Sequence, residues 1–162
     1  MRLLVSDANI FIDMEEGGLL ELMFKLPYEF CVPDALFAEE LAQQHGHQLE
    51  AKGLTKRTLN SEAMAYAFSL TQVFKGPSIN DCLALALAKF EACPLLTGDK
   101  ALRQAAKHEV VEVKGTIWLV EELLTHHLIM VDEALNAYAL MRTNARRLPW
   151  KQAAERLNKF EK

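Results

Sequence analysis

The sequence predicts an α/β fold in which a parallel sheet is covered by helices on both faces. Short apolar runs with β-like composition alternate along the chain with longer segments in which apolar residues recur at helical spacing. Two aspartates, Asp7 and Asp99, stand directly after two of these runs. In open parallel sheets the ligand site lies beyond the carboxyl ends of the strands, so this edge is where a functional site is expected.

Each strand is predicted from a short apolar run that stops at a turn signal or an acid, and each helix from apolar periodicity and capping residues. The predicted strands are residues 2–6, 29–32, 94–97 and 110–113. The predicted helices or helical turns are residues 9–14, 19–25, a helix opened by Pro33 that carries Leu36, Phe37, Glu40 and Leu41, then 59–73, 78–92, 100–108, 117–127, and two more from about residue 131, separated by Leu148 and Pro149. The polar residues 43–57 are expected to end a helix and form an exposed connection. The helix over 78–92 is expected to bury one face, formed by Ile79, Leu83, Ala86, Leu87 and Phe90.

Length and composition indicate one globular domain. A chain of 162 residues fits a single core, and 51% apolar with 25% charged residues excludes a disordered chain. No apolar run approaches the roughly 20 residues that span a bilayer. The start, MRLLVSD, becomes acidic too early for a signal peptide, so a cytoplasmic location is expected. The cysteines Cys31, Cys82 and Cys93 show no CxxC spacing and are expected to be buried thiols.

Charge is distributed unevenly along the chain. The net charge of −4 does not by itself indicate a nucleic-acid-binding protein. Residues 142–162, however, contain seven basic and two acidic residues, a local +5, so the first 141 residues carry −9. This basic segment could contact RNA phosphates, bind an acidic partner or form a solvated helix face, and the sequence leaves the three open.

Asp7 and Asp99 are the first two candidate site residues. A carboxylate at the carboxyl end of a strand can point into a shared crevice, and Gly98 allows the tight turn that brings Asp99 close to a neighbouring strand. Either aspartate could instead cap the helix that follows it.

Asp81 and Glu40 are the other two candidates. Asp81 comes three residues after Ser78, which matches a capping box, so a structural role competes with a functional one. Glu40 falls at the edge of the buried face of its helix, although a solvated helix acid is the simpler interpretation. If the helix register is shifted by one residue, Glu39 takes its place.

Convergence of the four acids would create a metal site. Four independent caps would not explain why two acids follow separate strands while the other two begin or line helices beside them. Crowded carboxylates repel each other unless a cation compensates, and a set of oxygen ligands without Cys or His suits Mg²⁺ or Mn²⁺. Such a site can polarise a phosphate and activate water for phosphodiester hydrolysis.

Five segments together resemble the PIN domain family over about residues 2–125: LLVSDANIFID, VPDALFAEEL, SINDCLALALAKF, CPLLTGDKALRQAA and KGTIWLVEEL. The resemblance implies a three-layer α/β/α sandwich with a central parallel sheet, formed by residues 1–128, with residues 129–162 as a helical extension packed on the same domain. It also implies a metal-dependent endoribonuclease of the VapC-like toxin type, held inactive by an antitoxin protein; dimers are common in such families.

The family's site residues are carried over by motif. Asp7 matches the aspartate after the first strand, Glu40 the helix glutamate before a leucine, Asp81 the acid of the middle helix, and Asp99 the acid of the TGD turn. Asn9 and Thr97 match polar positions that often support the metal site, although local turn hydrogen bonding explains them equally well. Asp13, Glu39 and Asn80 are further neighbours. Some members carry another acid after the TGD turn, where this chain has Leu102 and Arg103, which puts a second metal ion in doubt.

Three functions are compatible with the sequence. The first is an endoribonuclease that uses Mg²⁺ or Mn²⁺ and acts as the toxin of a type II toxin–antitoxin pair. The second is a catalytically silent PIN fold that binds RNA or protein. The third, a phosphohydrolase with Asp7 as nucleophile, is disfavoured because Asn9 stands where the haloacid-dehalogenase type has a second aspartate.

Overall fold

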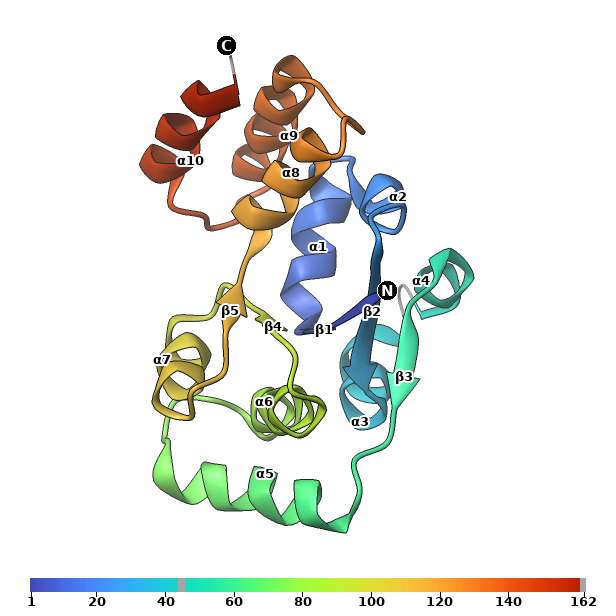
Figure 1. Ribbon diagram of the computed structural model, residues 1–162, viewed down its shortest axis with the longest axis vertical. Coiled ribbons are helices and arrows are strands. Elements are labelled where there is room, and N and C mark those ends of the chain that lie inside the picture. Colours follow the sequence, from blue (N-terminus) through green and yellow to red (C-terminus); the bar gives the residue numbers. More distant parts are fainter. Residues whose placement is uncertain (44–45, 161–162) are drawn as a thin grey trace.

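The computed structural model describes residues 1–43 and 46–160 and shows a central five-stranded sheet with helices on both sides (Figure 1). All strand pairs are parallel, and the strand order is β3-β2-β1-β4-β5. The strands are β1 (Arg2–Ser6), β2 (Tyr28–Pro33), β3 (Thr55–Arg57), β4 (Leu95–Leu96) and β5 (Val113–Lys114). The predicted three-layer α/β/α sandwich with a parallel sheet is confirmed.

Helices form the two outer layers. In Figure 1, α1, α8, α9 and α10 lie above the sheet, whereas α5, α6 and α7 lie below it. Helix α6 packs on β1, β2 and β4, and α5 covers its outer side. The helices are α1 (Ala8–Glu16), α2 (Leu20–Met23), α3 (Asp34–Leu36), the π-helical turn η1 (Phe37–Leu41), α4 (Gly46–Lys52), α5 (Ser61–Val73), α6 (Ile79–Glu91), α7 (Lys100–His108), α8 (Thr116–Thr125), α9 (Val131–Thr143), α10 (Trp150–Leu157) and the 3₁₀ turn η2 (Asn158–Phe160).

The strand order places a topological switch point between β1 and β4. From β1 the chain proceeds to β2 and β3 on one side, and it later returns to add β4 and β5 on the other. Val5 pairs with Leu95 and Ser6 with Leu96, so the next residue of each strand, Asp7 and Thr97, leaves the sheet at the same level. Ligands of open α/β sheets bind at such a switch point.

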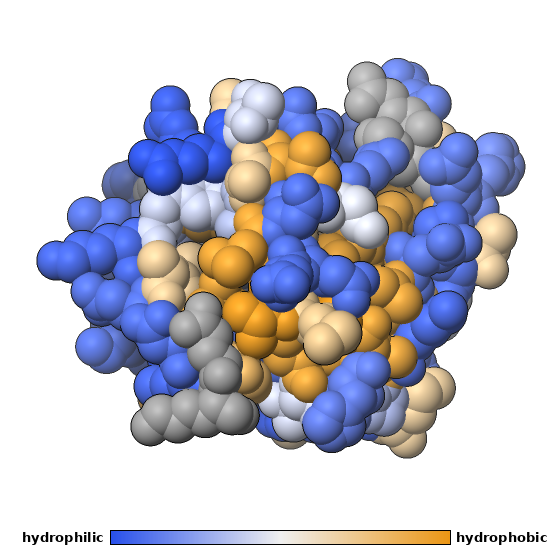
Figure 2. All heavy atoms as spheres, turned by 90° about the horizontal axis from the view of Figure 1, so that it is seen from above, coloured by the Kyte–Doolittle hydropathy of each residue, from blue (hydrophilic) through white to orange (hydrophobic). Residues whose placement is uncertain are grey.

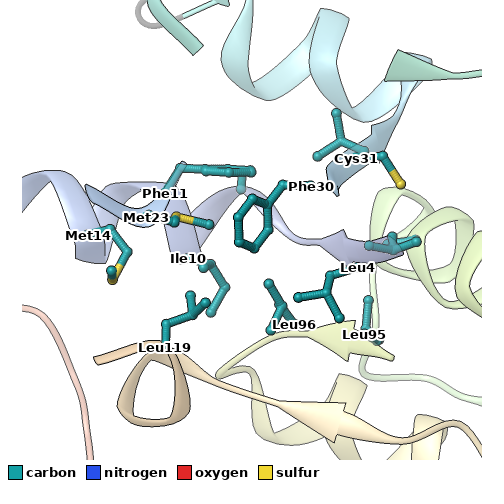
Figure 3. Packing of buried hydrophobic residues seen from close by; sticks show 14 of the residues in the cluster. Leu4, Ile10, Phe11, Met14, Met23, Phe30, Cys31, Leu95, Leu96 and Leu119 are labelled. Carbon is teal, nitrogen blue, oxygen red and sulfur yellow. The ribbon is translucent and has the colours of Figure 1, made fainter. Parts of the chain in front are cut away.

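The core lies against both faces of the central strands. Ile10 of α1, Phe30 of β2 and Leu119 of α8 point toward one another in Figure 3, and each is almost fully buried. Leu95 and Leu96 of β4 are completely buried as well. A two-residue strand is stable here because it lies between two neighbouring strands and under helices, which is where continuous apolar runs occur in parallel sheets.

The segment over residues 43–57 differs from its prediction. It contains helix α4 and the edge strand β3, rather than only an exposed connection; residues 44 and 45 lie outside the described part. Strand β3 is polar because it is an edge strand, and its Arg57 binds Glu29 of β2 at 2.8 Å. These residues form a strand because they pair with β2. Their polar sequence gives no sign of that pairing.

Two further expectations are corrected. The last strand begins at Val113, because Val110 adopts a left-handed conformation (φ 61°) and is exposed in the turn after α7. On α6, Ile79 and Phe90 are partly exposed, whereas residues 82–88 are all buried. The middle of this helix is enclosed by the sheet on one side and α5 on the other, so it has no single apolar face.

The C-terminal helices continue the upper layer. Helix α9 packs on α1 and α8. Figure 2 looks onto this end of the molecule and shows apolar side chains gathered in its middle with polar ones around them. Within the described residues, no helix is long and apolar enough to cross a membrane.

Candidate functional site

Asp7 is a buried carboxylate at the end of β1. One oxygen, Oδ1, accepts a hydrogen bond from the backbone N–H of Ile10 at 3.1 Å, which caps α1. The other, Oδ2, accepts one from the hydroxyl of Thr97. The side chain is only 4% exposed, and this burial raises the pKa of Asp7 to about 6. The two hydrogen bonds lower it, whereas the charges of Asp81 and Asp13 raise it further.

Thr97 connects Asp7 to Asp99. Its side chain is fully buried after β4, and its Oγ1 accepts a hydrogen bond from the backbone N–H of Asp99 at 3.1 Å while the hydroxyl donates to Asp7. The Asp99 side chain is exposed and caps α7 by accepting from the N–H of Leu102 at 2.8 Å. The structure thus brings Thr97 into direct contact with Asp7, and Asp99 joins them through its backbone.

Asp81 stands at the start of α6 and interacts with two other candidates. The capping box is present: Ser78 Oγ accepts from Asp81 N at 3.1 Å, and Asp81 Oδ2 accepts from Ser78 N at 2.9 Å. The negative charge of Asp81 raises the pKa of both Asp7 and Glu40. A capping role and proximity to other acids therefore coexist in this residue.

Glu39 and Glu40 lie on the π-helical turn η1. The N–H of Ala42 bonds to the carbonyl of Phe37 at 2.8 Å, so five residues separate donor and acceptor rather than four. This wider turn places two consecutive glutamates toward α6, and such turns are frequent at functional sites. Burial raises the pKa of Glu40, and the charges of Asp81 and Glu39 add to the rise. The choice between the two glutamates stays open because both interact with α6.

Asn80 interacts with both glutamates and is itself buried. Its Nδ2 donates to Glu39 Oε2 at 2.9 Å, and its amide also stabilises the charged form of Glu40, which offsets part of the rise in that pKa. Within the described residues, its Oδ1 has no hydrogen-bond partner although it is buried. A buried acceptor without a donor is unfavourable, and a cation or water would satisfy it.

The donor set suits a hard divalent cation, although the acids are not gathered into a finished ligand shell. Among residues 1–43 and 46–160, no three His, Cys, Asp or Glu side chains are arranged to hold a metal ion. The side chains nearest to the switch point offer oxygen ligands, their charges repel each other, and Asn80 adds an unsatisfied oxygen. These features fit Mg²⁺ or Mn²⁺ by ligand chemistry and position.

Asp13 and Asn9, in contrast, contact the C-terminal segment. Asp13 is buried and accepts hydrogen bonds from Thr116 Oγ1 at 2.7 Å and from Arg146 Nε at 2.6 Å. Arg146 also approaches the side-chain oxygen of Asn9, at 3.4 Å from its Nη2. Asp13 is therefore already neutralised by a cation of the chain itself, and Asn9 is oriented by the same arginine.

Three residues beside the site were not singled out as site residues from the sequence. Arg146 and Thr116 bind Asp13 from positions more than a hundred residues away, and no local signal could pair them. Arg103, at a position where some PIN proteins carry an acid, donates from Nη1 to the carbonyl of Thr97 at 3.3 Å. Its place one turn after Asp99 and this difference from the family pattern were the signals in the sequence.

Two solved structures are similar to this chain. A PilT N-terminus domain protein from the hyperthermophilic archaeon Sulfolobus solfataricus P2 has a TM-score of 0.50 and 13% identity, covering 76% of this chain and 94% of its own. VapBC2 from Rickettsia felis, solved bound to a DNA fragment from its promoter, has a TM-score of 0.49 and 15% identity, covering 70% of this chain and 98% of its own. At these identities the likeness to the archaeal protein concerns the fold alone. No curated protein matches the chain.

The family comparison covers almost the entire chain. The DUF3368 family model, described as a PIN domain, matches residues 3–162. The match includes the basic C-terminal segment as well as the five segments that resemble the family. With the parallel sheet, the switch-point aspartate and the TGD turn in place, this chain belongs to the PIN domain family.

Proposed function

We propose that the chain is an endoribonuclease that depends on Mg²⁺ or Mn²⁺ and hydrolyses phosphodiester bonds of RNA. PIN domains are generally nucleases and typically use divalent metals, so family membership supports the proposal. The observation that carries it is the buried Asp7 carboxylate at the switch point of the sheet, within the electrostatic reach of Asp81 and linked through Thr97 to Asp99.

The residues of the proposed site divide into ligands and supports. Asp7, Glu40, Asp81 and Asp99 would hold the cation, which would polarise a phosphate oxygen and lower the pKa of a bound water. The hydroxyl of Thr97 keeps the Asp7 carboxylate in one orientation. Burial raises the pKa of Asp7 to about 6, so in mildly acidic solution a proton competes with a cation for this carboxylate.

The decisive experiment compares Asp99→Asn with wild type in cleavage of single-stranded RNA with Mn²⁺ and with a chelator. Asparagine caps helices as well as aspartate does, so α7 should form normally. The matched control is Asp132→Asn, at an exposed position in the first turn of α9. We expect cleavage to fall by roughly a hundredfold or more in Asp99→Asn and to stay unchanged in the control. Undiminished cleavage by Asp99→Asn, or cleavage that persists in the chelator, would refute the proposal.

The same assay distinguishes Glu39 from Glu40. Both substitutions to glutamine keep size and polarity, and only the residue that provides a ligand should lose cleavage. We expect the larger loss in Glu40→Gln, because the charge of Asp81, another proposed ligand, is close enough to Glu40 to raise its pKa. The opposite order would assign the ligand to Glu39.

A PIN fold that binds RNA or protein without cutting is the second candidate. It is favoured by one observation: in the described part of the chain, no three acids are arranged as a finished metal site. This function predicts RNA binding that a chelator leaves unaffected and no cleavage products after long incubation with Mn²⁺. The missing cleavage products separate it from the nuclease, because the nuclease is also expected to bind RNA in a chelator.

We extend the proposal to the toxin of a type II toxin–antitoxin pair, with an antitoxin protein and a second copy of the chain as partners. Its support is family membership and the small size of the chain. Induced expression of wild type should slow bacterial growth, whereas Asp99→Asn at the same level should not. A small reading frame next to the gene should restore growth when expressed together with it. Equal growth of both strains would rule out the toxin role while leaving the nuclease activity to the assay above.

A further inference from the structure

A pocket of about 310 Å³ opens beside the proposed catalytic site, between the main fold and the C-terminal segment. One wall consists of Gly98 and Arg103, which flank Asp99, and another is the start of α8. The third wall comes from Arg147, in the segment that leads into α10, and from Gln152 of that helix. The volume lies at the lower end of the range of ligand pockets.

The pocket carries an excess of positive charge. Four of its side chains are basic, Arg103, Lys114, Arg147 and Arg156, and one is acidic, Glu121. Glu121 and Arg156 neutralise each other through bonds of 2.7 and 2.8 Å. Three cations therefore remain without compensation from inside the pocket.

Two of these cations are unpaired and available to a ligand. Lys114 has a partner on the surface, Glu112, at 3.1 Å. Arg103 and Arg147, by contrast, form no ion pair with a carboxylate of residues 1–43 or 46–160. The one hydrogen bond found for the Arg103 guanidinium in the described chain is the 3.3 Å bond to the carbonyl of Thr97. Guanidinium groups of this kind bind phosphate through two parallel N–H donors.

The start of α8 adds backbone donors to the same pocket. This ten-residue helix begins after Gly115, and no side chain caps it. The hydroxyl of Thr116, which could otherwise serve the helix end, donates to Asp13 instead. Thr116 and Ile117 line the pocket, so the first turn of α8, where the helix dipole is positive, borders the same space as the two arginines.

The positive surface continues past the pocket. A more open hollow of about 890 Å³ lies on the other side of Arg103 and shares Gly98, Pro149 and Gln152 with the first. Lys100 and Lys107 of α7 line it. A charged strand that crosses this surface would meet cations on both sides of Arg103.

We propose that the pocket binds a backbone phosphate of the RNA strand next to the linkage that is cut. This inference rests on the proposed nuclease function. Two hydrogen bonds connect the pocket to the proposed catalytic site: Arg103 donates to the carbonyl of Thr97, and the hydroxyl of Thr97 donates to Asp7. A phosphate held by Arg103, Arg147 and the α8 N-terminus positions the strand relative to the carboxylates. The basic C-terminal segment is thereby assigned a role in substrate binding.

The test measures binding of a short, fluorescently labelled single-stranded RNA by anisotropy, in a chelator so that the strand stays intact. Arg103→Gln, Arg147→Gln and the double variant are compared with wild type over a salt series. Lys151→Gln is the matched control, because Lys151 is an exposed cation of α10 outside the pocket. Thermal unfolding of each variant verifies folding, and Arg147→Gln by itself suffices if Arg103→Gln is destabilised.

We expect each pocket substitution to weaken RNA binding by roughly three- to tenfold, nearly independently of base sequence, and to reduce the salt slope by about 0.7. In Mn²⁺, the double variant should raise KM while kcat at saturating RNA stays close to that of wild type. Affinity, salt slope and KM equal to those of Lys151→Gln would overturn the pocket assignment. Displacement of the RNA by poly-glutamate as effective as by unlabelled RNA would overturn it too, in favour of an acidic protein segment.

The outcomes separate this inference from the proposed function. Weaker RNA binding by the pocket variants without any cleavage by wild type would refute the nuclease but retain a phosphate site. Normal cleavage with unchanged KM in the double variant would retain the nuclease and refute the site.

Discussion

The carboxylate of Asp7 should make the protein less stable at neutral pH than at mildly acidic pH, and Asp7→Asn should remove this effect. Folding buries Asp7 and raises its pKa from 3.8 to about 6. As the pH rises, the unfolded chain therefore releases this proton first. Between the two pKa values the folded state binds more protons at Asp7, so the contribution of this residue to stability falls with increasing pH and levels off above about pH 6.

The magnitude follows from the size of the shift. Each pKa unit corresponds to about 1.4 kcal/mol, so a rise from 3.8 to about 6 destabilises the folded state by about 3 kcal/mol at neutral pH. Roughly 2 kcal/mol of this should develop between about pH 4.5 and 7.5, since part of the effect is already present at the lower pH. For a chain of 162 residues, 2 kcal/mol corresponds to a change in Tm of about 4–8 °C. Asparagine keeps the acceptor for Ile10 but places an amide nitrogen opposite the Thr97 hydroxyl. That second change does not depend on pH, so the pH dependence of the difference reports the ionisation of Asp7.

The assay is urea unfolding of the metal-free wild type and Asp7→Asn over this pH range. The advantage of the variant should grow as the pH rises and then level off. Asp132→Asn, the same change at an exposed position, reports the pH dependence of a carboxylate that water reaches. If the difference between Asp7→Asn and wild type is the same at every pH, Asp7 is not desolvated in the folded chain and the reasoning fails.

Two further predictions concern the partners of these buried acids. Thr97→Val removes the hydroxyl that donates to Asp7, so the pKa of Asp7 should rise above its wild-type value and the free energy of unfolding should fall by about 1–3 kcal/mol in urea denaturation. Thr97→Ser, which keeps the hydroxyl, should lose clearly less, and equal losses in the two variants would contradict the hydrogen bond. Arg146→Gln leaves the buried Asp13 carboxylate without its ion-pair partner, and we expect a loss of about 2–4 kcal/mol by chemical denaturation. In a double-mutant cycle with Asp13→Asn the losses should be less than additive, and strict additivity would show that the pair contributes nothing.

Features that depend on a few neighbouring residues could be predicted from the sequence. The capping box of Ser78 and Asp81 lies within one helical turn, and the caps formed by Asp7 and Asp99 involve the next three residues. The alternation of strands and helices is a local pattern as well, which explains why the parallel sheet was predicted correctly. For these aspartates, the capping interpretation and the site interpretation turned out to be compatible.

Features that depend on distant partners could not be predicted. Strand β3 consists of polar residues and exists because it pairs with β2. Ile79 and Phe90, at the two ends of α6, are partly exposed because the sheet and α5 enclose only the middle of the helix. The spacing of apolar residues does not show where along a helix its neighbours lie. The sequence places Arg103 on α7, but it does not predict the hydrogen bond from its side chain to the carbonyl of Thr97.

The sequence by itself determined that the chain forms a parallel α/β fold and that aspartates stand at the carboxyl ends of two strands, because both are written in short-range patterns. Only the tertiary structure decided what surrounds those aspartates. In the folded chain Asp7 is buried and bonded to Thr97. Asp13, the second buried acid, is neutralised by Arg146, which is 133 residues away in the sequence. The tertiary structure also turned the basic C-terminal segment into one wall of a charged pocket beside the site. Burial and long-range charge pairing depend on how segments far apart in the sequence pack together. A local pattern of residues does not specify which distant segments will meet.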